Sequence, residues 1–96
     1  MEIIHLETEN FKNLIKEKVL VDFYANWCGP CKMITPELER VDSTIKTIKV
    51  DVDRFEEIAK EYGVMSIPTL ILFDKGKEIK RTIGFIDKEK IEKFIN

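Results

Sequence analysis

Two cysteines three residues apart, Cys28 and Cys31, are the part of this 96-residue sequence best suited to chemistry. A disulfide between them would close a very small loop, so it would restrict the unfolded chain little and add little stability. In a short chain with no other cysteine, this spacing favours either metal binding or thiol–disulfide exchange.

The segments on either side indicate where the cysteines lie in a fold. Residues 19–25 form a nearly continuous run of β-branched and aromatic residues, which is typical of a strand covered on both faces. Pro30 suits the first turn of a helix, because the N–H that proline lacks has no partner there. We therefore expect a helix over residues 29–42, with the cysteines at its start.

A helix N-terminus distinguishes the two thiols. Its unpaired N–H groups and partial positive charge stabilise a thiolate over a thiol. Cys28 would lie just before the first turn, as an exposed attacking thiolate. Cys31 would lie one turn later on the same face, more enclosed, as the resolving thiol. Gly29 and Pro30 form the turn that brings both sulfur atoms within bonding reach.

Three other readings of the cysteines compete with redox chemistry. A structural zinc site normally has four ligands, and the chain offers two cysteines and one histidine, His5, on a different predicted strand. A purely structural disulfide and a pair of inert buried thiols are the other two. The strand–turn–helix context favours redox chemistry, so we expect no metal and no cofactor besides the Cys28–Cys31 disulfide.

Asp22 interrupts the apolar strand six positions before Cys28. Burying a carboxylate is costly unless it is paired or neutral, and burial raises its pKa. Such a group could take the proton from Cys31 when that thiol attacks a mixed disulfide. Lys49, on the neighbouring predicted strand, could modulate it. Alternatively, Asp22 faces solvent or makes a structural hydrogen bond, and Lys49 faces solvent.

Pro68 opens another predicted strand, a position that tolerates proline. The Ile67–Pro68 bond is of the one type that readily becomes cis. A cis bond would present the backbone of Ile67 as a short edge able to pair with an extended peptide. An ordinary trans proline at a strand start is the alternative.

Periodicity along the rest of the chain predicts the order β-α-β-α-β-α-β-β-α. We expect strands over residues 2–6, 19–25, 45–52, 69–73 and 78–83, and helices over residues 8–17, 29–42, 53–62 and from 87 onward. Pro36 should kink the second helix, Asp53 with Glu56 should cap the third, and Asp87 should cap the last. The result is one α/β domain over residues 1–96, with a mixed sheet and helices on both faces.

Composition narrows the possible partners and location. Hydrophobic residues make up 44% of the chain, enough for one core, and the net charge of −2 does not suit a general nucleic-acid binder. No apolar run is long enough to span a membrane. The first five residues lack a basic region followed by an apolar stretch, so we expect no signal peptide and a cytoplasmic location.

Together these motifs resemble the thioredoxin family. The run Val21-Asp22-Phe23-Tyr24-Ala25-Asn26-Trp27-Cys28-Gly29-Pro30-Cys31-Lys32-Met33 looks like its active-site segment, and Trp-Cys-Gly-Pro-Cys-Lys is highly specific for it. Downstream motifs follow in matching order: Val50-Asp51-Val52-Asp53, Tyr62-Gly63-Val64, Ile67-Pro68-Thr69-Leu70, Phe73-Asp74-Lys75-Gly76-Lys77 and Gly84.

The resemblance implies a thioredoxin fold and a protein-disulfide reductase that contributes to electron transport and cell redox homeostasis. It implies that Cys28 attacks, that Cys31 resolves and that a thioredoxin reductase restores the dithiol. It further implies Asp22 as the buried acid with Lys49 as its neighbour, and Pro68 as a cis-proline beside the sulfurs. Trp27, Ile67 and Gly84 would form the apolar rim that docks disulfide-containing proteins. The chain would act as a monomer, without nucleic acid or membrane.

The sequence departs from the family pattern at two places. Tyr24 stands where many members have tryptophan, which places a hydroxyl near the active-site loop. The segment over residues 36–50 is short, so the second helix should end early.

Two other functions fit the same sequence. A binding module would use the apolar rim of Trp27, Ile67 and Phe85, with the redox state incidental. An oxidase or isomerase would act in an oxidising compartment.

Overall fold

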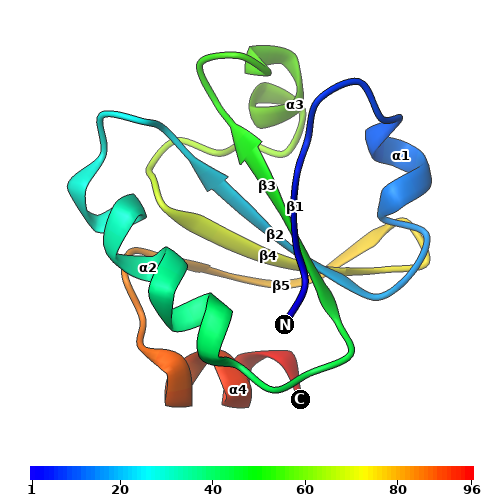
Figure 1. Cartoon of the computed structure of the whole chain (residues 1–96). Coiled ribbons are helices and arrows are strands. Elements are labelled where there is room, and N and C mark those ends of the chain that lie inside the picture. The colour runs from blue at the N-terminus through cyan, green and yellow to red at the C-terminus, as the bar shows by residue number, and fades with distance from the viewer.

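The computed structural model describes residues 1–96 and contains the nine elements in the predicted order. Figure 1 shows a central twisted sheet with helices packed on both of its faces. The elements are β1 (Ile3–His5), α1 (Phe11–Leu14), β2 (Val19–Tyr24), α2 (Gly29–Arg40), β3 (Lys46–Asp51), α3 (Glu56–Glu61), β4 (Thr69–Asp74), β5 (Lys77–Ile83) and α4 (Lys88–Ile95).

The sheet has the strand order β1-β3-β2-β4-β5 and is mixed, as predicted. β3 runs parallel to both β1 and β2, whereas β4 is antiparallel to β2 and to β5. β2 is therefore the central strand, and it leads directly into the segment that carries the cysteines. Its register with β3 places Asp22 opposite Lys49.

Two apolar clusters hold the layers together, one on each face of the sheet. The face covered by α1 and α3 buries Val21, Phe23 and Phe73 together with Phe11 and Ala59 from the helices. The opposite face, covered by α2 and α4, has a cluster of its own: Leu20, Ile34, Leu38, Val41, Leu70, Leu72, Ile91 and Ile95. The alternation of strand side chains between faces produces this division.

α1 is shorter than the predicted helix over residues 8–17. Asn10 caps its start, because the Asn10 side chain accepts a hydrogen bond from the backbone N–H of Asn13. At the other end, the carbonyls of Ile15 and Lys16 accept hydrogen bonds from Gly76 and Lys75 in the β4–β5 turn. A tertiary contact therefore satisfies two carbonyls that have no partner within the helix.

The predicted capping pair of Asp53 and Glu56 is wrong. α3 begins at Glu56, with Phe55 at the N-cap position and no side-chain cap. Asp53 lies in the preceding turn, where its carboxylate accepts a hydrogen bond from Trp27. α2 ends early, as expected from the short following segment, and continues through Pro36. The cap of α4 is confirmed, since Asp87 accepts a hydrogen bond from the backbone N–H of Lys90.

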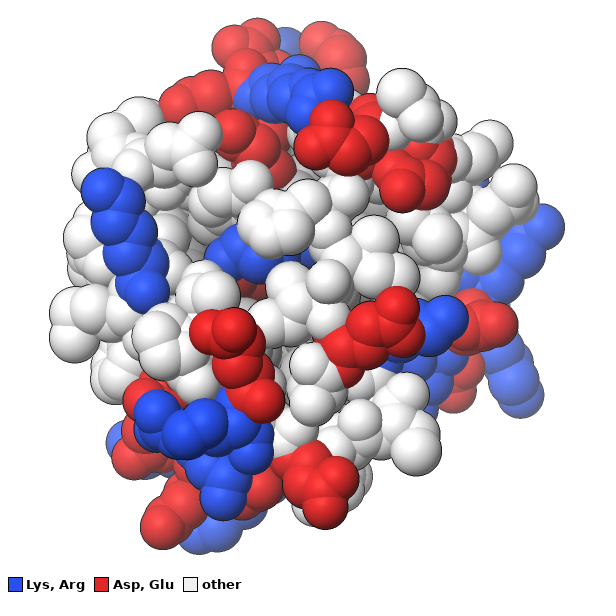
Figure 2. Space-filling model, viewed as in Figure 1, with Lys and Arg blue, Asp and Glu red and all other residues white.

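Charged residues of both signs share the surface. On the face shown in Figure 2, acidic residues predominate near α3, both signs mix around α2 and α4, and a largely uncharged band lies between them. None of the helices combines the length and the apolar character that crossing a membrane would require.

Candidate active site

Cys28 and Cys31 lie where the central strand passes into α2, as the sequence predicts. They form a disulfide with their Cα atoms 5.2 Å apart, so the structure shows the oxidised state. Ala25, the residue after β2, packs with both cysteines in a small buried cluster. The bonded sulfur atoms exclude the interpretation of two unconnected inert thiols.

Cys28 is the N-cap residue of α2, and its sulfur accepts a hydrogen bond from the backbone N–H of Cys31 at 3.2 Å. This places the sulfur where the unpaired N–H groups of the helix start favour negative charge. The expected difference in exposure is small, because Cys28 is 5% exposed and Cys31 is 2% exposed. Cys28 is thus the more accessible thiol, but in the disulfide state it is buried rather than exposed.

Asp22 and Lys49 form an ion pair within the protein. Asp22 is fully buried and Lys49 is 4% exposed, which excludes the solvent-facing alternatives for both residues. The Lys49 ammonium donates to Asp22 Oδ2 at 3.1 Å, whereas Oδ1 of the same carboxyl has no hydrogen-bond partner. Burial raises the pKa of Asp22 above its ordinary value, although the adjacent Lys49 charge partly opposes this.

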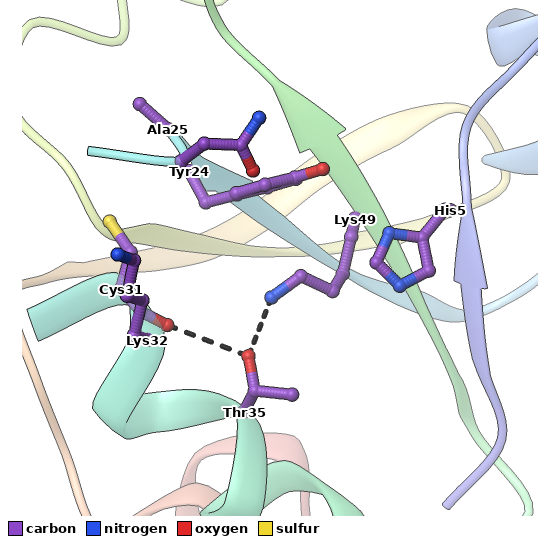
Figure 3. Close-up of a pocket in the computed structure, with 8 residues that line it drawn as sticks. His5, Tyr24, Ala25, Cys31, Lys32, Thr35 and Lys49 are labelled. Atoms are coloured by element: carbon purple, nitrogen blue, oxygen red, sulfur yellow. Dashed lines mark hydrogen bonds between the residues drawn. The ribbon is translucent and has the colours of Figure 1, made fainter. Parts of the chain in front are cut away.

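The Lys49 ammonium has two further neighbours besides Asp22. It donates to the hydroxyl of Thr35 at 2.7 Å, and it lies 4.5 Å from the centre of the Tyr24 ring. The Thr35 hydroxyl in turn donates to the carbonyl of Cys31 at 3.5 Å. Figure 3 shows the Lys49 side chain extending past Tyr24 toward Thr35.

These side chains line a pocket of about 200 Å³ next to the disulfide. It is lined by His5, Tyr24, Ala25, Asn26, Cys31, Lys32, Thr35 and Lys49. Lys49, the basic member of the buried ion pair, therefore lines the same pocket as Cys31, whereas Asp22 is not among the lining residues.

The Ile67–Pro68 segment lies beside the sulfurs. The peptide bond is cis, and the Cys28 sulfur lies 3.9 Å from the carbonyl oxygen of Ile67. Gly84 approaches from the end of β5, where its N–H donates to the carbonyl of Pro68 at 2.8 Å. Gly84 has a φ of 96°, which favours glycine, and the space above it is open.

Trp27 projects from the loop before α2 and is 70% exposed. Its indole N–H donates to the Asp53 carboxylate at 2.8 Å. The predicted site residues thus come from three segments: the loop with Trp27 and Cys28, the Ile67–Pro68 segment, and Gly84. The Cys28–Ile67 and Gly84–Pro68 contacts link these segments.

Sequence reasoning missed three residues at the site. Thr35 lies one helical turn after Cys31, and that spacing was a usable signal. His5 carried no functional signal in the sequence; it is exposed at the end of β1, where it lies opposite Lys49 in the β1–β3 register and lines the pocket. The contact of Asp53 with Trp27 had no local signal, because 26 residues separate them. No three His, Cys, Asp or Glu side chains lie close enough together to hold a metal ion.

Comparison with known proteins finds similar sequences and structures over nearly the whole chain. The thioredoxin family model matches residues 2–96. A thioredoxin from Chlamydia caviae is 46% identical, covering 95% of this chain and 93% of that protein, and one from Bacillus subtilis is 43% identical, covering 100% and 97%. A solved thioredoxin variant from Halobacterium salinarum superposes with a TM-score of 0.90 at 32% identity, covering 98% of this chain and 88% of that one. With its disulfide at the start of α2, the chain belongs to the thioredoxin family and is a thiol–disulfide oxidoreductase of that type.

Proposed function

We propose that the chain reduces disulfides in other proteins, with Cys28 as the attacking thiol and Cys31 as the resolving thiol. The observation that carries this assignment is the position of the Cys28 sulfur at the N-cap of α2, where it accepts the Cys31 N–H at 3.2 Å. In the reduced protein, the same interaction would favour a thiolate at Cys28. Cys31 lies inside the first turn and is the less accessible of the two.

The reaction proceeds in two displacements. The Cys28 thiolate attacks one sulfur of the substrate disulfide, a Cys28–substrate disulfide forms, and the other substrate sulfur leaves as a thiolate that takes up a proton. Cys31 then loses its proton and attacks the Cys28 sulfur, which releases the second substrate thiolate. Two electrons pass to the substrate, and the Cys28–Cys31 disulfide seen in the structure remains.

Asp22 is the proposed base for the second displacement. Burial raises its pKa, so the carboxylate is a better proton acceptor than an exposed aspartate would be. Its Oδ1 atom is buried and has no partner, and Lys49 occupies the other oxygen. Lys49 therefore limits how far the pKa of Asp22 rises and fixes the carboxyl in one orientation.

The substrate docks on the rim around the disulfide. This rim comprises Trp27, Gly29, Pro30, Ile67, Pro68 and Gly84. The exposed indole supplies apolar contact, and the Ile67 backbone next to the sulfur supplies a short edge for an extended peptide. A small apolar rim with no strong charge suits many protein partners that are held briefly.

The proposed cellular setting is a cytoplasmic monomer that carries electrons from a thioredoxin reductase to disulfide-containing proteins and so contributes to redox homeostasis. The dithiol is the only redox group this cycle needs, since each displacement uses sulfur atoms alone. Measurement of the reduction potential of the dithiol against a glutathione couple tests the direction in which electrons flow. A potential more reducing than glutathione supports a reductase, and a more oxidising value would instead favour an oxidase or isomerase.

The roles of the two cysteines are tested by single serine variants assayed with a small disulfide-bonded protein as substrate. Cys28→Ser should abolish disulfide reduction, because no attacking thiolate remains. Cys31→Ser should accumulate a covalent Cys28–substrate adduct that runs as one band on a non-reducing gel. Unchanged reduction by Cys28→Ser, or an adduct formed through Cys31 instead, would contradict the assignment.

A further inference from the structure

Thr35 occupies an unusual place, since its hydroxyl connects the buried ion pair to the active-site helix. It accepts a hydrogen bond from the Lys49 ammonium at 2.7 Å, which is shorter than the 3.1 Å separating that ammonium from Asp22. It also donates to the carbonyl of Cys31 at 3.5 Å. A single hydroxyl therefore contacts both the cation beside the proposed base and the backbone of the resolving cysteine.

An ammonium group has three hydrogens, and the structure accounts for three neighbours of Lys49. Asp22 Oδ2 and the Thr35 hydroxyl take two hydrogen bonds, and the face of the Tyr24 ring lies 4.5 Å away as the third. Of these, Thr35 is the nearest oxygen. Because the ring is a weaker and less directional partner, the position of the ammonium depends chiefly on Thr35 and Asp22.

We propose that Thr35 is a positioning residue of the active site: its hydroxyl anchors Lys49 so that the ammonium engages Asp22 Oδ2 and leaves Oδ1 free to accept the proton from Cys31. The hydrogen bond of Thr35 to Cys31 sets the direction of its lone pairs, because the hydroxyl hydrogen is directed at the carbonyl and the oxygen faces the ammonium. This role deepens the proposed function, since it rests on Asp22 as the base.

Loss of the hydroxyl has a defined electrostatic consequence. Without its nearest oxygen, the Lys49 ammonium is held less firmly and supports the charged form of Asp22 less well. The other charged or titratable side chains around the pocket are His5 on β1, Lys32 on α2 and Tyr24 on β2, and none of them is altered by the substitution. We therefore expect Asp22 to titrate at a higher pH when Thr35 lacks its hydroxyl.

The test compares Thr35→Val and Thr35→Ala, which both lack the hydroxyl, with Thr35→Ser, which retains it. Thr44→Val, at an exposed position outside the pocket, is the matched control. NMR titration of the Asp22 carboxyl carbon in the reduced protein should show an upward shift of about half a pH unit or more in both hydroxyl-free variants. Thr35→Ser and Thr44→Val should titrate as the wild type does.

The pH profile of mixed-disulfide resolution provides the second readout. The hydroxyl-free variants should reach their half-maximal resolution rate at a pH shifted upward by the same amount, while the rate of the first attack stays unchanged. An unchanged or lowered Asp22 titration midpoint in both variants would overturn the proposal. If the midpoint rises but the resolution profile does not follow, Thr35 positions Lys49 and the assignment of Asp22 as the base is what fails.

Discussion

Side chains on the two faces of β2 have contrasting surroundings, one apolar and one containing a buried ion pair. Val21 and Phe23 point to the face covered by α1 and α3, where they join a cluster made entirely of apolar residues. Asp22 and Tyr24, which alternate with them along the strand, point to the opposite face. There Asp22 forms a buried ion pair with Lys49, and Tyr24 lines the pocket next to the disulfide. Neighbouring residues of one strand thus lie in very different surroundings, because successive side chains alternate between the two faces.

The apolar cluster on the face covered by α1 and α3 contributes to the stability of the fold. Phe73 is fully buried there, with the ring of Phe11 at 6.0 Å and the ring of Tyr62 at 5.1 Å in edge-to-face arrangements. Such contacts add to the favourable burial of apolar area. The opposite face also has an apolar cluster, but its buried ion pair is destabilising in one respect, since taking a carboxylate and an ammonium out of water is unfavourable before their attraction is counted. Lys49 of this ion pair lines the same pocket as Cys31.

The largest expected effect is a loss of stability when the apolar cluster that contains Phe73 is disrupted. Phe73→Ala should lower the free energy of unfolding by about 3–5 kcal/mol, because it removes a buried ring and leaves a cavity. Urea denaturation measures this loss. Disulfide reduction by the fraction that remains folded should be close to that of the wild type.

Phe73→Leu is the control, because it keeps most of the apolar volume and should cost clearly less than the alanine variant. A loss of activity in the folded Phe73→Ala protein, out of proportion to its unfolded fraction, would show that the two faces are not separable.

An intermediate effect is expected from a change in the buried ion pair. Asp22→Asn should slow resolution of the mixed disulfide by about 100-fold, because the amide cannot accept the proton from Cys31. Formation of the mixed disulfide should slow much less, since Cys28 attacks as a thiolate. Stopped-flow measurement of the two steps with a disulfide-bonded peptide separates them. Equal slowing of both steps, or of neither, would refute the assigned role.

The smallest effect is the pH dependence of stability. Burial raises the pKa of Asp22 in the folded state above that in the unfolded chain, so between the two values the folded protein holds a proton that the unfolded chain has released. Stability from this group is therefore greatest below the unfolded pKa of about 3.9 and falls as the pH rises through the folded pKa. The slope is at most about 1.4 kcal/mol per pH unit.

Subtracting the unfolding free energy of Asp22→Asn at each pH isolates this contribution, because the other titrating groups are shared. The difference, wild type minus variant, should decline between about pH 4 and the folded pKa and be level above it. A difference that rises with pH would mean that the Lys49 charge outweighs burial at this carboxyl.

Local patterns were sufficient for much of the site. The position of the cysteines at a strand–helix junction followed from the apolar run over residues 19–25 and from Pro30. The place of Asp22 within that run favoured its burial but left a solvent-facing carboxylate possible, and the structure excludes that alternative. Local patterns gave the wrong bounds or partners where a distant segment makes contact. The β4–β5 turn binds carbonyls just after α1, and Trp27 binds the Asp53 carboxylate.

By itself, the sequence determined the order of the elements and favoured a redox pair and a buried acid, because each depends on hydrophobic spacing or on residues a few positions apart. Only the tertiary structure decided that Lys49 lies opposite Asp22, that Thr35 holds the same ammonium and that Ile67 lies against the Cys28 sulfur. These contacts join residues 14 to 39 positions apart. They depend on strand order, parallel register and the packing of α2 on the sheet, which no local spacing encodes.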